Sequence, residues 1–154
     1  MKFQGEIRVT APREAVFDKI NDPLFFASRI EGVSNMTEID PQHFTATLET
    51  RIAYIKFKFA VTVEIVDRER PVRVVARAEG TPLGIVGRLS STSTATLTDD
   101  GAGTCIGYEI DASLTGKLGS LGQPVMKSKA NEMERQFAKA IAAAFDPSLA
   151  GAAP

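Results

Sequence analysis

Few side chains in this sequence have the types and spacing that catalytic or metal-binding chemistry needs. His43 is the only histidine and Cys105 is the only cysteine, so a histidine–cysteine metal site lacks ligands. His43 opens an expected strand beside a turn, where an exposed side chain is the simpler interpretation, and nothing supports a Ser-His-Asp arrangement around it. Cys105 is out of phase with Ile106 and Tyr108, which indicates a small filler on the other sheet face rather than a nucleophile. We therefore expect neither a catalytic residue nor a metal site.

Two further motifs resemble sites but fit turns and bends better. The pair Asp99-Asp100 precedes a Gly-Ala-Gly run, which is typical of a hairpin turn rather than of paired catalytic carboxylates. Gly80, Gly84 and Gly87 are spaced like part of a phosphate loop, but no Lys-Ser/Thr follows them and no helix begins there. These glycines instead favour a bend in a sheet or the close approach of a ligand.

The overall composition narrows the class of protein. A chain of 154 residues is expected to form one domain and to bury a core without help from a disulfide or a metal. The formal net charge of -1 argues against a nucleic-acid-binding face. A single cysteine excludes an intramolecular disulfide, the first ten residues lack the apolar run of a signal peptide, and no run is long enough to span a bilayer. We expect a cytoplasmic protein.

Hydrophobic periodicity predicts one strand, two short helices, six more strands and a long helix. Alternating residues predict strands over 2–9, 33–39, 43–52, 55–65, 72–78, 89–97 and 106–114, with the region 81–87 ambiguous. The first helix is expected after a cap at Thr10 or Ala11, with Pro12 in its first turn, and the second over 24–30. This order predicts an α+β protein whose antiparallel sheet of about seven strands curls around the closing helix. Residues 1–146 would form this domain and 147–154 a disordered tail.

The closing helix is the most informative segment of the chain. It is expected to begin near Ser120, which forms a capping-box pattern with Gln123, and no later than Pro124. Glycines before it predict a hinge: Gly116, Gly119 and Gly122. One stripe at helical spacing is apolar: Leu118, Val125, Met126, Met133, Phe137, Ala140, Ile141 and Ala144.

The expected inward face of the sheet places small residues beside large ones. The small residues are Ala76, Ala78, Gly87, Ser91, Ser93 and Ala112. Interdigitated packing accounts for such a pattern, but small residues on adjacent strands facing a single helix also predict an unfilled apolar hollow that binds a small molecule. The predicted ligand-binding residues are Phe25, Phe44, Leu48, Phe57, Phe59, Val61, Val74, Ala76, Leu89, Tyr108, Ile110, Val125, Met126, Lys129, Met133 and Phe137.

Two charged features each leave two interpretations open. Lys129 falls inside the apolar stripe of the helix, where either its stem covers the core while its head reaches water, or its ammonium lies at the mouth of the hollow. Charges on the outward sheet face indicate either cross-strand ion pairs, which we favour, or a docking surface. The cations are Lys56, Lys58, Arg73, Arg77 and Arg88, interleaved with Glu49, Glu64, Glu79, Glu109 and Asp111.

Several motifs, in their order and spacing, resemble the carbon monoxide dehydrogenase G-subunit family. They are Pro12-Arg-Glu-x-Val16-Phe17 followed by Asn21-Asp22-Pro23, the long strand from Ile55, the 80–87 glycine loop, and Gly116-Lys117-Leu118-x-x-Leu121-Gly122 followed by Gln136-Phe137. The resemblance covers nearly the whole chain, from Met1 to about Phe145. It implies a helix-grip fold of the lipid-transfer-like and polyketide-cyclase-like superfamily.

The same resemblance implies a function beside a molybdenum enzyme. It leads us to expect a non-catalytic protein that holds a hydrophobic ligand, such as a quinone or another lipid, without a covalent cofactor. Such a protein would link a molybdenum carbon monoxide dehydrogenase, or a related hydroxylase, to membrane electron transport. Some members carry a C-terminal membrane anchor, whereas this sequence stops at Pro154, so we expect transient contact at the inner membrane face.

Two alternatives to a carrier follow from the same residues. An assembly or membrane-recruitment factor would act on the dehydrogenase through its surface and would need no ligand. A cyclase-like enzyme would place substrate near Tyr108 or Asp111.

The sequence departs from the family pattern at one step. The family often has a Pro-Gly-Cys step where this sequence has Glu31-Gly32-Val33.

Overall fold

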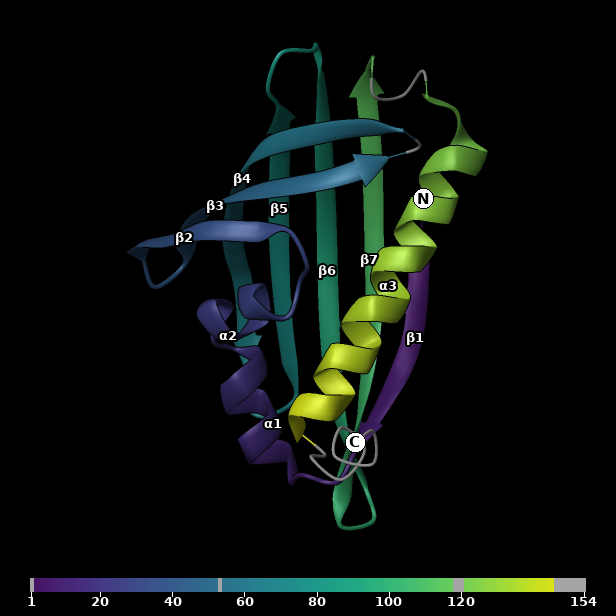
Figure 1. Cartoon of the computed structure of the whole chain (residues 1–154). Helices are drawn as coiled ribbons and strands as arrows, with labels where there is room; N and C mark the ends of the chain where they lie inside the picture. The colour runs from purple at the N-terminus through teal and green to yellow at the C-terminus, as the bar shows by residue number, and fades with distance from the viewer. Residues whose placement is uncertain (1, 53, 118–120, 146–154) are drawn as a thin grey trace.

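A computed structural model describes residues 2–52, 54–117 and 121–145 (Figure 1). Within these ranges, three helices and seven strands follow one another along the chain. The N-terminal half contains β1 (Lys2–Val9), α1 (Arg13–Ile20), α2 (Pro23–Ser28), β2 (Val33–Asp40), β3 (His43–Ile52) and β4 (Ile55–Glu69). The C-terminal half contains β5 (Arg73–Pro82), β6 (Gly87–Asp100), β7 (Gly103–Gly116) and α3 (Gln123–Phe145).

All these strands form one antiparallel sheet in the order β1-β7-β6-β5-β4-β3-β2. The sheet curls because its pairing is interrupted by bulges, one of them in β4 between Ile65 and Asp67. The β3–β4 hairpin turns across the other strands, and α3 lies over the concave face (Figure 1). This arrangement confirms the predicted α+β helix-grip fold.

The apolar core is divided into two clusters at opposite ends of α3. The first cluster joins α1 to the C-terminal end of α3 and to the sheet, and it includes Phe17, Phe44, Leu97, Ile141 and Phe145. The second cluster joins the β3–β4 hairpin to the start of α3, and it consists of Ile52, Phe57, Phe59 and Met126 with partly buried neighbours. The ends of α3 are therefore packed more completely than its middle.

Most predicted elements are confirmed, but several boundaries differ. Pro12 is the N-cap of α1, with extended backbone and no side-chain cap, instead of lying in the first turn. Strand β4 continues to Glu69, beyond the predicted turn, and the ambiguous region resolves into the end of β5 at Pro82 and a loop over 83–86. The second helix ends at Ser28, two residues earlier than expected.

The expected start of the closing helix is confirmed in part. Helix α3 begins at Gln123 with Pro124 in its first turn, where proline is tolerated. Gly122 precedes it with a φ of 90°, a left-handed conformation that favours glycine. Leu118, Gly119 and Ser120, and with them the capping box and part of the hinge, lie outside the described residues. The tail over 147–154 also lies outside them.

Candidate functional site

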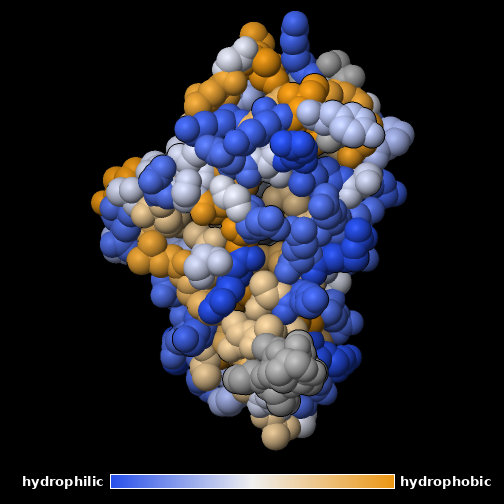
Figure 2. Space-filling model, viewed as in Figure 1, coloured by the Kyte–Doolittle hydropathy of each residue, from blue (hydrophilic) through white to orange (hydrophobic). Residues whose placement is uncertain are grey.

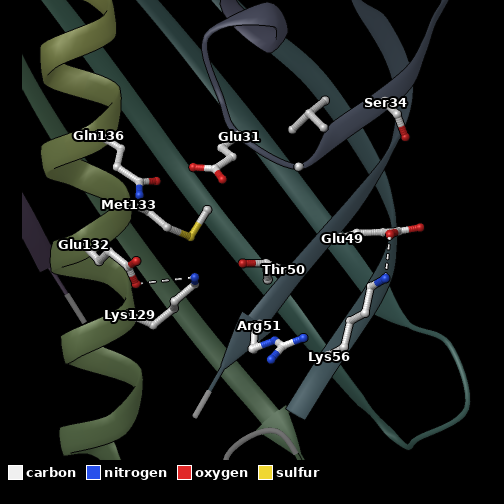
Figure 3. A pocket seen from close by; sticks show the side chains of 12 residues that line it. Glu31, Ser34, Glu49, Thr50, Arg51, Lys56, Lys129, Glu132, Met133 and Gln136 are labelled. Atoms are coloured by element: carbon white, nitrogen blue, oxygen red, sulfur yellow. Dashed lines mark hydrogen bonds and ion pairs between the residues drawn. The ribbon is translucent and has the colours of Figure 1, made fainter. Parts of the chain in front are cut away.

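A cavity of about 550 Å³ opens between the β2–β3 edge of the sheet and α3 (Figure 3). The helix side contributes Lys129, Glu132, Met133 and Gln136. The sheet side contributes Glu31, Gly32, Val33, Ser34, Glu49, Thr50, Arg51 and Lys56. The curl of the sheet creates this opening, because it brings the β3–β4 hairpin alongside a helix from the opposite end of the chain.

The mouth of the cavity carries charges of both signs. The side chain of Lys129 is only 18% exposed, and its Nζ lies 3.4 Å from Oε2 of Glu132, one turn further along α3. On the opposite wall, Nζ of Lys56 lies 3.5 Å from Oε2 of Glu49. Figure 3 shows the guanidinium of Arg51 in the space between these walls. The mouth therefore offers several hydrogen-bond donors to a polar group without a large excess of either charge.

The middle of the concave face of the sheet carries small side chains, which we call the floor. The strand register places Ser91 between Ala78 and Ala112, and Ser93 between Ala76 and Ile110. These side chains are only partly buried, although their strands lie in the middle of the sheet. Ala76 packs on the first cluster, but Ala78, Ile110 and Ala112 belong to neither cluster, so the central part of this face is less completely covered than its ends.

The predicted ligand-binding residues divide between the cavity and the two clusters. Lys129 and Met133 line the cavity. Phe25, Phe44, Val74, Ala76, Tyr108 and Phe137 belong to or pack on the first cluster. Leu48, Phe57, Phe59, Val61, Leu89, Val125 and Met126 belong to or pack on the second. Ile110 is partly buried opposite Ser93. Ligand contact by these residues stays a prediction.

Sequence reasoning does not find the polar wall of the cavity. The strand pattern predicts Glu49 and Lys56 on a solvated sheet face, and it indicates no role for Glu31 or Arg51. The signal for this wall is Gly32, which has a φ of 93° and accepts a hydrogen bond of 2.9 Å from the backbone N–H of Glu49. A Cβ at Gly32 would collide with the Glu49 carbonyl, so glycine is required where the chain enters the wall.

Tyr108 connects the sheet to the middle of α3. Its hydroxyl donates a 2.8 Å hydrogen bond to Oε2 of Glu134 in α3. Burial and this bond raise the pKa of Tyr108 to about 12, so the phenol stays protonated at neutral pH. Gly5 in β1 lies against the phenol ring and leaves no room there for a Cβ. Tyr108 therefore positions α3 and is poorly suited to acid–base chemistry.

The remaining titratable candidates lie away from the cavity. His43 is on the convex face and contacts Asp40 and Glu64. Cys105 is buried and donates to Oε2 of Glu6 at 2.8 Å, and this bond and burial raise the pKa of its thiol. Among the described residues, no group of three or more His, Cys, Asp or Glu side chains is placed to hold a metal ion.

Several of the charges predicted on the outward face form cross-strand ion pairs, the interpretation that the sequence pattern favours. Lys56 and Lys58 both approach Glu49, Arg77 lies 3.5 Å from Glu64, and Arg73 lies 2.7 Å from Asp67. These pairs are substantially exposed, so each contributes little to stability.

One protein-family model matches nearly the whole chain. The family model described as the carbon monoxide dehydrogenase G subunit (CoxG) matches residues 5–145. No curated protein sequence matches the chain. Within the described residues, no helix is both long and apolar enough to cross a bilayer.

Solved structures show the same fold at low sequence identity. A conserved protein from Geobacillus kaustophilus is 23% identical, with a TM-score of 0.84 and coverage of 96% of this chain and 97% of that one. A protein from Chromobacterium violaceum is 18% identical, with a TM-score of 0.70 and coverage of 95% and 97%. The Zhui aromatase/cyclase from Streptomyces sp. R1128 is 11% identical, with a TM-score of 0.66 and coverage of 99% and 98%.

Proposed function

The chain belongs to the CoxG family, that of the carbon monoxide dehydrogenase G subunit, and from this premise we propose that it carries a hydrophobic small molecule between its sheet and α3. Family membership and the helix-grip neighbours are consistent with a hydrophobic-ligand-binding protein. The observation that carries the proposal is the partly exposed floor of Ala78, Ser91 and Ala112 between two packed apolar clusters. Such a floor accepts an apolar body, and the mouth above it accepts a polar head.

A quinone fits this division of the site. Its ring and isoprenoid tail are apolar, and its two carbonyl oxygens accept hydrogen bonds. Lys129 and Arg51 provide donors in the cavity, and Met133 provides an adaptable apolar wall beside them. The proposed partner is a molybdenum carbon monoxide dehydrogenase or a related hydroxylase. The quinone would accept two electrons and two protons from this enzyme and deliver them to the membrane chain.

We assign the protein a carrier role rather than a catalytic one. The family name describes a component of a dehydrogenase, which favours an accessory role. The aromatase/cyclase among the structural neighbours shares the fold. In this chain, however, Tyr108 is hydrogen-bonded to Glu134, and Asp111 pairs in register with the outward residues Lys2 and Thr92. Neither side chain is arranged as an acid or base over the floor.

The carrier proposal is tested by filling the floor. Ser91→Phe places a ring in the hollow, and Thr92→Phe places the same ring on the outward face of the same strand as the matched control. Purified wild-type protein, incubated with a short-chain ubiquinone, should show a one-to-one complex in native mass spectrometry. Thr92→Phe should keep this complex and Ser91→Phe should lose it.

Folding is checked by a cooperative thermal transition of each variant. If Ser91→Phe fails to fold, Ala78→Leu provides a smaller filling at the neighbouring floor position. Phe57→Arg is unsuitable, because Phe57 is packed in the second cluster and a charge there would be buried without a partner. A wild-type protein that binds no quinone or lipid, or equal binding by both phenylalanine variants, overturns the proposal. If the Ser91→Phe variant binds no ligand but still co-purifies with the dehydrogenase, that result would support the recruitment alternative.

A further inference from the structure

One end of the molecule exposes large apolar side chains on two separate loops. Tyr54 is 96% exposed and Ile55 51% exposed at the turn of the β3–β4 hairpin. Leu83, Ile85 and Val86 are 58%, 37% and 76% exposed in the loop between β5 and β6. We call these five residues the apolar tip. Figure 1 shows both loops at the end of the molecule where α3 begins, and Figure 2 shows apolar side chains gathered at that end.

The backbone holds the β5–β6 loop of the apolar tip in place. The N–H of Leu83 donates to the Lys58 carbonyl at 2.9 Å, and the N–H of Lys117 donates to the Val86 carbonyl at 2.9 Å. Between these anchors, Gly84 has a φ of 87° with open space around it, which permits the tight reversal. The loop is thus tied to β4 on one side and to the end of β7 on the other, while its apolar side chains are exposed to solvent.

Cationic residues surround the apolar tip. The segments 50–58, 81–90 and 113–117 contain five cations and no Asp or Glu: Arg51, Lys56, Lys58, Arg88 and Lys117. We call these residues the basic collar. The other exposed large hydrophobics of the described chain each lie within two positions of an acidic residue: Leu24 near Asp22, Ile39 near Glu38 and Asp40, and Val66 near Glu64 and Asp67. Among the described residues, exposed apolar side chains flanked by cations alone are therefore confined to this end.

We propose that the apolar tip inserts into the interfacial region of an anionic lipid bilayer while the basic collar contacts lipid phosphates. Apolar side chains enter the boundary between headgroups and acyl chains, and cations beside them are attracted to the negative surface. Glu49 pairs with Lys56 and Lys58 and offsets part of the positive charge of the basic collar. The purpose of this contact, exchange of the ligand with the bilayer, rests on the proposed function. The attraction between the apolar tip, the basic collar and the bilayer does not.

The docked end is continuous with the cavity. Arg51 and Lys56 belong to the basic collar and also line the cavity wall. An apolar molecule leaving the bilayer along the β3–β4 hairpin would therefore meet the cavity mouth without crossing the rest of the surface. This continuity favours a lipid surface over a protein partner as the occupant of this end.

Vesicle flotation tests the proposal with matched variants. The test variant is Leu83→Glu with Val86→Glu, and the control is Ile39→Glu with Val66→Glu, which adds the same charges at exposed apolar positions elsewhere. Wild-type protein and the control should bind phosphatidylcholine vesicles that contain about one third phosphatidylglycerol. The test variant should bind at least about tenfold more weakly. Wild-type binding should also fall when phosphatidylglycerol is omitted or when salt is raised to about 500 mM.

Several outcomes would overturn the proposal. They are an absence of wild-type binding to anionic vesicles, an equal loss in both double variants, or a tip-dependent dimer in sedimentation without vesicle binding. Tip-dependent binding of the purified dehydrogenase in place of vesicles would also overturn it. Ubiquinone binding in detergent-free solution separates this proposal from the proposed function. A folded test variant should still form the one-to-one complex, whereas loss of that complex in wild-type protein would contradict the carrier role alone.

Discussion

His43 lies on the convex face between two carboxylates, with its Nδ1 2.8 Å from Oδ1 of Asp40 and its Nε2 3.3 Å from Oε2 of Glu64. The hydrogen bond to Asp40 is the main cause that raises the pKa of His43 above its ordinary value. Because the folded pKa exceeds the unfolded one, the charged imidazolium stabilises the fold fully below about pH 6.5. This contribution is lost as the pH rises through the folded pKa.

We expect His43→Gln to remove this pH dependence. The free energy of unfolding of the wild-type protein, measured in urea, should fall between about pH 6 and pH 8 by more than that of His43→Gln. Asp40→Asn should behave like His43→Gln, because Asp40 provides the strongest partner. Parallel pH profiles for all three proteins would contradict the assignment.

Among the described residues, Thr104 is the buried polar side chain whose substitution should lower the free energy of unfolding most. Its side chain is 0% exposed, and its hydroxyl donates to the Ala11 carbonyl at 2.8 Å, joining β7 to the segment before α1. Thr104→Val keeps the shape but removes the donor, so unfolding should become easier by about 1–3 kcal/mol. Thr98→Val is the control, because Thr98 is exposed and its bond to the Cys105 carbonyl is long at 3.5 Å. Denaturant titration of both variants checks the difference.

At the scale of elements, the bond between Tyr108 and Glu134 fixes the middle of α3 over the sheet. Tyr108→Phe should lower stability by about 1–2 kcal/mol, since a hydrogen bond to a carboxylate is lost at a partly buried site. It should also speed the release of bound ubiquinone in stopped-flow exchange, because the helix is held less firmly over the cavity. Tyr54→Phe, at a position 96% exposed, should change neither quantity. Slower or unchanged release from Tyr108→Phe would indicate that α3 is a fixed wall.

The local sequence pattern predicts the presence of a helix or strand better than it predicts where that element ends. The alternation from Ile55 to Ile65 predicts β4 because each inward residue is large and apolar. The extension of β4 to Glu69 is not visible in that pattern, because the bulge after Ile65 breaks the alternation. A hinge at Gly122 is consistent with its left-handed backbone, but an alanine there would introduce strain as well as stiffness. Replacing the hinge glycines by alanine is therefore a poorer test of helix motion than Tyr108→Phe.

At the scale of the whole molecule, binding in the hollow should stabilise the fold. A ligand at about 100 times its Kd adds about 2.7 kcal/mol, which for a chain of this size raises Tm by about 5–10 °C. Differential scanning calorimetry with a short-chain ubiquinone checks this shift. Thr92→Phe should show the full shift and Ser91→Phe should show none. An equal shift in both would place the ligand outside the floor.

The sequence predicts part of the candidate site and misses another part, for a physical reason. Alternation along each strand predicts that Ala78, Ser91 and Ala112 face inward, but only the structure gives the register that brings them side by side. The mouth depends on how far the sheet curls. Arg51 and Lys129 line the same cavity because the β3–β4 hairpin lies toward α3, and no periodicity within either segment predicts that arrangement.

The separation of the apolar core into two clusters has a consequence for volume. Hydrostatic pressure favours states with less void space, and unfolding eliminates internal voids. We therefore expect the less completely covered middle of the sheet face to be more compressible than the clusters around Phe17 and Phe59. An occupant of the hollow removes that difference. If the proposed function holds, the ligand-free protein should show a larger volume change of unfolding under pressure than the ligand-bound protein.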